Sequence, residues 1–197
     1  YLKEEVARLS NNDKEGDVIA PIATRDTLTG LPNRILFTEK ISDFYLDDGK
    51  VNNASLILIN IDHLRFHNEK FGVSEVNKAI CRLAMILKRR LKSHDFVARI
   101  GGNEFAVIIA DIAQDTAGAI AERLRVSARK IALSPTSRMT LSIGVADNSN
   151  TAIPQELFAR AELALLASRT GSRDCVTVYG KDVAMRSRQA YLMHLKP

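Results

Sequence analysis

The sequence predicts an α+β domain built on a central, mostly antiparallel sheet that is flanked by helices. An almost continuous apolar run at 54–61 (ASLILINI) has the length and character of a buried central strand. Two further strand-like runs, 96–100 and 104–110, are joined across Gly101-Gly102, and such a hairpin requires antiparallel pairing. Amphipathic helical patterns alternate with these strands, so the faces of the sheet are expected to be covered.

The chain before the first strand divides into three parts. Residues 1–10 place apolar and charged side chains at helical spacing, and the polar, breaker-rich stretch that follows indicates a linker. Within 25–45, the turn Leu31-Pro32-Asn33 precedes an amphipathic helix. We therefore expect an N-terminal linker helix and connector at 1–23.

The elements after the first strand follow from the same periodicities. A short helix ends at Gly72, and Ser74 is a candidate cap for the strong helix at 74–91. The remaining expected elements are a helix at 115–132, a strand at 138–146, a helix at 154–169 that begins at Pro154, and a strand at 175–179. The central order β-α-β-β-α-β is ferredoxin-like, with one added helix and strand. We expect the domain to span 24–180 and a connector helix to follow at 181–197.

Composition restricts the class of protein. Of 197 residues, 46% are hydrophobic and 26% charged, the ordinary balance of a soluble globular domain. The net charge of +5 suits a phosphate-bearing partner, but no dense basic block and no Trp indicate nucleic-acid binding. No apolar run approaches the roughly 18 residues of a membrane helix. Cys81 and Cys175 are interpreted as reduced core thiols of a cytoplasmic domain. The chain begins at Tyr1, as expected of a piece of a longer protein, and membrane anchoring of that parent stays open.

Four stretches carry a family resemblance. They are Asp26–Arg34 (DTLTGLPNR), Asn60–Gly72 (NIDHLRFHNEKFG), Arg99–Phe105 (RIGGNEF) and Ser142–Ala146 (SIGVA). In this order and spacing they resemble the motifs of GGDEF domains, which make cyclic di-GMP from GTP. The resemblance covers about residues 24–180 and implies a polymerase-palm-like sheet flanked by helices, in agreement with the element order.

The resemblance implies diguanylate cyclase chemistry, in which two GTP-loaded domains face each other and divalent cations neutralise the phosphates. The family places metal-binding carboxylates at the positions of Asn60 and Asn103. Each amide keeps the shape of the acid but carries no charge to offset a cation. We expect no cyclase activity, with Glu104 a remnant of the acidic signature. The alternative is that Asp62 and Glu104 take over as ligands.

The resemblance also implies contacts to a guanine nucleotide. Asn68 falls where the family reads the guanine edge, and Asn77 replaces an Asp that accepts two guanine N–H groups, so recognition is expected to be weakened. Asn77 is otherwise a solvated helix position. Gly101 and Gly102 allow close approach of the α-phosphate, and they form a hairpin turn whether or not nucleotide binds.

Basic positions complete the expected site. Arg65 replaces the Lys of the second motif, and Arg169 and Arg173 fall where the family directs a Lys and an Arg at the distal phosphates. The three retained cations favour a polyphosphate ligand, and their alternative role is ordinary surface charge at helix ends. Many family members have an inhibitory product site with the sequence R-x-x-D. The corresponding residues here are Lys92 to Asp95, so the Asp is kept, and Lys replaces the Arg without its ability to form two parallel hydrogen bonds.

Three functions remain open on the sequence. The first is an inactive, regulatory GGDEF module that binds GTP or another guanine nucleotide and controls an attached EAL phosphodiesterase domain, which the charged tail after residue 180 would precede. The second is an active cyclase with unusual metal ligands. The third is a ligand-free dimerisation module. No resident cofactor is expected, with Mg²⁺ entering only together with GTP, and no nucleic-acid partner is expected.

Overall fold

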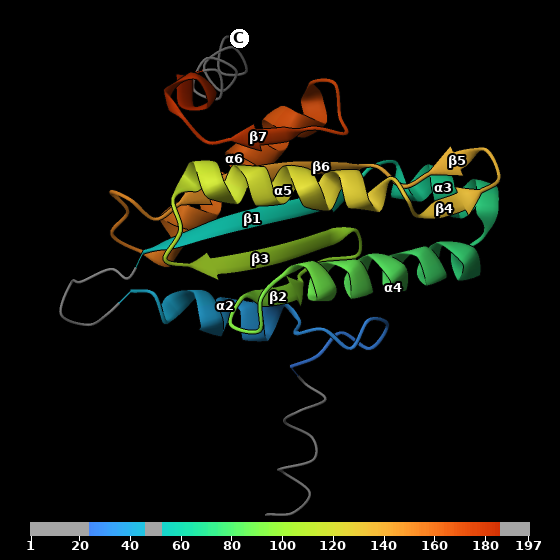
Figure 1. Ribbon diagram of the computed structural model, residues 1–197, viewed down its shortest axis with the longest axis horizontal. Coiled ribbons are helices and arrows are strands. Elements are labelled where there is room, and N and C mark those ends of the chain that lie inside the picture. Colours follow the sequence, from blue (N-terminus) through green and yellow to red (C-terminus); the bar gives the residue numbers. More distant parts are fainter. Residues whose placement is uncertain (1–23, 46–52, 186–197) are drawn as a thin grey trace, which may run out of the picture.

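The computed structural model describes residues 24–45 and 53–185, which form a five-stranded sheet between two layers of helices and a separate two-stranded hairpin (Figure 1). The strand order in the sheet is β2-β3-β1-β6-β7, and only the pairing of β6 with β7 is parallel. The predicted α+β class and the mostly antiparallel sheet are therefore confirmed. The elements in chain order are α2 (Arg34–Ser42), β1 (Ala54–Ile61), α3 (Leu64–Phe71), α4 (Val73–Arg90), β2 (Phe96–Arg99), β3 (Glu104–Ala110), α5 (Gln114–Ala128), β4 (Ala132–Ser134), β5 (Ser137–Arg138), β6 (Leu141–Asp147), α6 (Pro154–Thr170) and β7 (Val176–Val178).

The central strand β1 is buried along its whole length, as its apolar run predicts. Ile57, Ile59 and Ile61 face the core formed with α4 and α5, while Leu56 and Leu58 face the core formed with α2 and α6. Because successive side chains of a strand point to opposite faces, a strand covered on both sides has to be apolar at nearly every position. The even-numbered face of β1 is therefore the one that carries Asn60 at its end.

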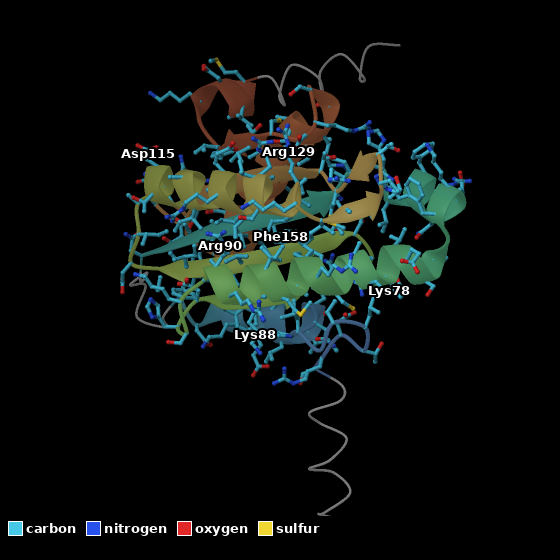
Figure 2. The ribbon with its side chains drawn as sticks, turned by 45° about the vertical axis from the view of Figure 1, so that its right-hand side comes forward. Lys78, Lys88, Arg90, Asp115, Arg129 and Phe158 are labelled. Atoms are coloured by element: carbon cyan, nitrogen blue, oxygen red, sulfur yellow. The ribbon has the colours of Figure 1, made fainter. Side chains whose placement is uncertain are left out.

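The helices are positioned by local chemistry at their ends. The side chain of Asn33 accepts from the backbone N–H groups of Ile35 and Leu36 and so caps α2. Gly72, at a φ of 81°, ends α3 and immediately precedes α4. The charged side chains Lys78, Lys88 and Arg90 lie along α4 (Figure 2).

Helix α6 packs directly on β6, and Gly144 makes this possible. A Cβ atom at this position would collide with the backbone of Ala161 and Leu165. The glycine thus lets the helix approach the strand more closely than any other residue would allow.

Three details of the sequence prediction are wrong. Ser74 does not cap α4, because Gly72 already starts the helix and Ser74 lies within its first turn. Helix α5 ends at Ala128 instead of 132, since the chain turns there and enters the small β4–β5 hairpin. The expected strand at 138–146 is two strands, because the chain leaves the hairpin at Met139 before β6 begins.

The predicted helix at 1–10 lies outside the described residues, as does the predicted tail helix beyond residue 185. Residues 181–185 are helical. No helix in the described ranges combines the length and apolar character needed to cross a bilayer.

Candidate functional site

The motif residues meet where β1 ends beside the β2–β3 hairpin. In the sheet register Asn60 lies opposite Glu104 on one side and opposite Ser142 on the other. Directly paired residues of antiparallel strands share one face, so these three side chains lie on the α6 side of the sheet. Two motifs far apart in sequence are thereby brought to a single edge of the domain.

The two asparagines at the expected metal-ligand positions are held differently. Asn60 is 4% exposed, and its amide nitrogen Nδ2 is buried without a hydrogen-bond partner among the described residues. The Nδ2 of Asn103 donates to the carbonyl of Ile61 at 3.4 Å, while the backbone N–H of Ile61 donates to the Asn103 carbonyl at 2.9 Å. Both amides therefore present N–H groups at the strand end, where a cation would need oxygen.

Asp62 is buried and fully engaged in the fold. One carboxylate oxygen accepts from the hydroxyl of Ser142 at 2.7 Å, and the other accepts from the backbone N–H of Asp174 at 3.2 Å. A buried carboxylate with both oxygens hydrogen-bonded connects β1 to β6 and to the loop before β7. The Asp62 side chain therefore stabilises the end of the central strand.

Glu104 turns away toward α2 and α6. Its oxygen Oε2 lies 3.8 Å from the Arg34 guanidinium and folds over Gly101, where an added Cβ would lie 2.9 Å from that oxygen. Burial raises the pKa of nearby Glu162 above its ordinary value, and the Glu104 charge raises it further, against the opposing effect of Arg34. Glu104 thus belongs to a small charged cluster with Arg34 and Glu162.

A Mg²⁺ ion of the kind that the family resemblance implies does not fit these residues. Within the described ranges no group of three or more His, Cys, Asp or Glu side chains is arranged to hold a metal. Hard cations require several oxygen ligands, preferably anionic. The strand end offers amide N–H groups instead, and the one on Asn60, which has no partner within the described residues, suits an oxygen of an anion.

Of the two expected guanine-binding positions, Asn77 borders a groove beside α4. Leu28, Asn77 and Cys81 line an open hollow of about 670 Å³ beside α4. Asn68, on α3, has a buried oxygen Oδ1 without a partner in the described part of the chain. Cys81 is half-buried and donates from its thiol to the carbonyl of Leu28, so the prediction of a core thiol is wrong because this thiol borders the groove.

The three expected phosphate-directed arginines are all exposed. Arg65 pairs with Glu69 at 2.9 Å within α3, and Arg169 lies in the last turn of α6. Arg173 follows α6, and its NH1 lies 3.3 Å from Nε2 of His63 at the start of α3. Arg65, in the first turn of α3, and Arg173, whose side chain reaches His63, therefore place two positive charges near the amino end of α3.

The residues at the expected inhibitory product site, Lys92 to Asp95, form a tight turn after α4. The backbone N–H of Lys92 donates to Oδ2 of Asp95 at 2.8 Å, while the Lys92 side chain is exposed. Oδ1 of Asp95 is buried, with the protonatable ring of His94 at 3.8 Å. The carboxylate of Asp95 thus stabilises its own loop.

The first motif supports the hairpin, a role that the sequence reasoning did not assign. Asp26 accepts from the backbone N–H and hydroxyl of Thr29 and pairs with Arg99 at 3.1 Å. The other guanidinium nitrogen of Arg99 donates to the carbonyl of Gly102 at 2.7 Å. Burial raises the pKa of Asp26, but the hydrogen bonds from Thr29 and the contact with Arg99 outweigh burial and lower it below its ordinary value. The spacing of Asp, Thr and Gly in that motif was the available signal of a structured turn.

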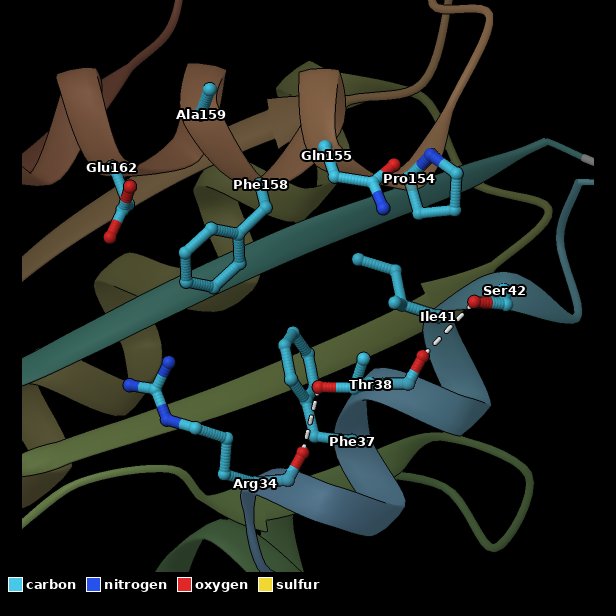
Figure 3. Close-up of a pocket in the computed structure, with 10 residues that line it drawn as sticks. All are labelled: Arg34, Phe37, Thr38, Ile41, Ser42, Pro154, Gln155, Phe158, Ala159 and Glu162. Carbon is cyan, nitrogen blue, oxygen red and sulfur yellow. Dashed lines mark hydrogen bonds between the residues drawn. The ribbon is translucent and has the colours of Figure 1, made fainter.

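A second feature that sequence reasoning missed is a groove between α2 and α6 (Figure 3). It has a volume of about 260 Å³, its apolar wall is formed by Phe37, Ile41 and Phe158, and Arg34 and Glu162 lie at one end. The rings of Phe37 and Phe158 are 5.9 Å apart. The groove connects to the signature hairpin through Arg34, whose Nε donates to the carbonyl of Ile100 at 2.8 Å.

Residues 23–175 match the family described as "Diguanylate cyclase, GGDEF domain". The chain is 34% identical to diguanylate cyclase DgcM of Escherichia coli over 155 residues, which are 78% of this chain and 38% of DgcM. It spans 24–44% of the length of the first curated relatives that it matches.

Two solved structures share the fold over most of the chain. One is the coiled coil and GGDEF domain of DgcB from Caulobacter crescentus in complex with c-di-GMP, with a TM-score of 0.78 and 26% identity over 90% of this chain and 96% of that one. The other is diguanylate cyclase SiaD of Pseudomonas aeruginosa in complex with its activator SiaC, with a TM-score of 0.73 and 25% identity over 89% and 71% of the two chains.

Proposed function

This chain belongs to the GGDEF domain family, and on that premise we propose that it is a catalytically silent member that binds a guanine nucleotide and acts as a regulatory module in cyclic di-GMP signalling. The family makes cyclic di-GMP from GTP, and that chemistry depends on cations held at the phosphates. The positions that differ here are those of the expected metal ligands.

The observation that carries the proposal is the hydrogen bonding of Asn60 and Asn103. The Asn103 amide donates to the Ile61 carbonyl, so that carbonyl is already used by an N–H group. The buried Nδ2 of Asn60 adds a second donor at the strand end. Asp62 is committed to Ser142 and Asp174, which opposes its recruitment as a replacement ligand. Loss of one preorganised electrostatic contributor typically costs about 10²–10³ in rate, so loss of both would suppress turnover.

Retained nucleotide binding is supported by buried polar groups for which the described part of the chain supplies no hydrogen-bond partner. Asn68 presents a buried acceptor, which suits the N–H donors on a guanine edge. Asn60 presents a buried donor, which suits a phosphate oxygen. Buried polar atoms are usually hydrogen-bonded, and a bound ligand would satisfy both. Arg65 and Arg173 add exposed positive charge near the same helix end.

The proposed regulatory role requires a domain that receives the signal. The chain spans less than half of its first curated relatives, so an attached output domain is a natural receiver of the signal. We propose an EAL phosphodiesterase for this receiver, because the charged segment after residue 180 resembles a connector. A phosphodiesterase assay on the parent protein, with and without GTP, tests this part separately.

The experiment that tests the proposal is calorimetric titration of the chain with GTP, with and without Mg²⁺, together with an assay for cyclic di-GMP. Saturable binding that persists without Mg²⁺ and gives no product is expected. Formation of cyclic di-GMP by the purified chain would overturn catalytic silence. Absence of heat at millimolar GTP would overturn nucleotide binding and leave a ligand-free dimerisation module.

A further inference from the structure

The loop between α6 and β7 contains two consecutive residues in a left-handed conformation. Arg173 has a φ of 52° and Asp174 a φ of 44°, and neither is glycine. Side-chain-bearing residues rarely adopt this conformation, and two in succession require surrounding structure that holds them there. The loop therefore has a fixed shape that its own sequence does not favour.

The carboxylate of Asp174 supplies the restraint. Its two oxygens accept from NH1 of Arg125, on α5, at 2.9 Å and from Nε of Arg129, the residue that follows this helix, at 2.6 Å. Arg125 also donates to the backbone carbonyl of Asp174 at 3.0 Å, so one guanidinium is hydrogen-bonded to both the side chain and the main chain of the turn. Arg129 lies at the end of α5, on the side of the molecule that carries β7 (Figure 2).

This restraint is largely shielded from water and reaches the strand end. The side chains of Arg125 and Asp174 are only 12% and 17% exposed, so their charges interact strongly. On the other side of the turn the backbone N–H of Asp174 donates to Asp62, which is itself held by Ser142. The loop is thus held by hydrogen bonds to Arg125 of α5 on one side and to Asp62, at the end of β1, on the other.

The consequence is the placement of Arg173. With the turn fastened at Asp174, the preceding side chain extends to the amino end of α3, where its NH1 meets His63 at 3.3 Å. His63 is also left-handed, at a φ of 53°, and directly follows Asp62. The guanidinium is therefore held beside the strand end without an acidic partner of its own among the described residues.

We propose that Asp174 is a positioning residue, which, through Arg125 and Arg129, fixes the turn that directs Arg173 at the phosphates of a bound nucleotide. The inference rests on the proposed nucleotide binding and adds that α5 controls the phosphate end of the site. A ligand whose phosphates engage Arg173 stabilises the turn and α5, and a partner that displaces Arg125 or Arg129 weakens phosphate binding in return.

The test compares ligands that differ in their phosphates. The full chain is titrated with GTP, GMP and inorganic tripolyphosphate, as wild type and as Asp174→Asn, Arg173→Gln and the double variant. Asp115→Asn is the matched control, because it removes the same charge from an exposed position on α5 outside the network. Thermal unfolding by circular dichroism confirms that every variant is folded at the assay temperature.

We expect Asp174→Asn to weaken GTP and tripolyphosphate binding by about tenfold, to leave GMP binding unchanged, and to add nothing to Arg173→Gln. Equal losses for GTP and GMP, or full additivity of the two substitutions, would show a merely structural ion pair and overturn the inference. Binding of tripolyphosphate without GTP would reject guanine recognition and retain the role of Asp174. Binding of neither ligand by the wild type would reject both.

Discussion

The backbone N–H of Asp174 donates to the carboxylate of Asp62, a residue 112 positions earlier in the chain. This bond joins the last loop of the domain to the end of its central strand. It commits the carboxylate of Asp62, in the motif Asn60–Gly72, to the fold, at the place where a replacement metal ligand would be expected.

Restoring the two carboxylates tests catalytic silence directly. The wild-type chain is expected to form no cyclic di-GMP, and the double variant Asn60→Asp, Asn103→Asp is expected to gain Mg²⁺-dependent binding of GTP and measurable product, because two anionic oxygens return to the strand end. Product is measured by chromatography after incubation with GTP. Each single variant serves as control and is expected to be lower by about 10²–10³ than the pair. Turnover by the wild type at the level of the double variant would contradict the prediction.

Removal of Asp174 is expected to destabilise the domain. Asp174→Ala leaves Arg125 with most of its surface buried and only Glu122 as an anionic partner within the described residues. Breaking a buried pair by removing one partner costs about 3–5 kcal/mol, and the partial exposure here favours the low end. The free energy of unfolding is measured by urea denaturation. Asp115→Ala, at an exposed position in the first turn of α5, is expected to change it by at most about 1 kcal/mol, and an equal loss in both variants would refute the assignment.

Gly144→Ala is expected to disturb the packing of α6 on β6. The new methyl group would collide with the backbone at Ala161 and Leu165, and backbone cannot move aside as a flexible side chain can. Overpacking of this kind costs about 1–3 kcal/mol or more. Gly180→Ala is the control, since a Cβ there meets nothing within 4 Å. Equal unfolding midpoints for the two variants would show that the helix shifts without cost.

Acid is expected to weaken the support of the signature hairpin through Asp26. Its folded-state pKa lies below the ordinary value of 3.8, so the ionised carboxylate stabilises the fold at all pH values above 3.8 and loses this contribution as pH falls through the lower, folded-state pKa. Asp26→Asn should therefore be less stable than wild type at pH 7, with the difference shrinking below about pH 4. Urea unfolding at several pH values measures this. A difference that stays constant down to pH 2 would show that the ionised carboxylate is not responsible.

Much of the architecture was predictable from the sequence alone. The apolar run of β1, the hairpin at Gly101-Gly102 and the start of α6 at Pro154 follow from periodicity and turn chemistry, which act over a few neighbouring residues. The β4–β5 hairpin and the end of α5 at Ala128 were missed, because short strands of two or three residues carry too little pattern to distinguish them from a fraying helix. The family motifs, and the two asparagines that depart from them, were likewise visible without a structure.

The sequence by itself determined the sheet, the family and the missing charges at Asn60 and Asn103, because each of these depends on residue type and local spacing. Only the tertiary structure decided the partners of those residues. It committed Asp62 to Ser142 and Asp174, turned Glu104 toward Arg34, and fastened Arg173 through α5. Such contacts join residues tens of positions apart, and they depend on which strands and helices pack together, information that no local pattern contains.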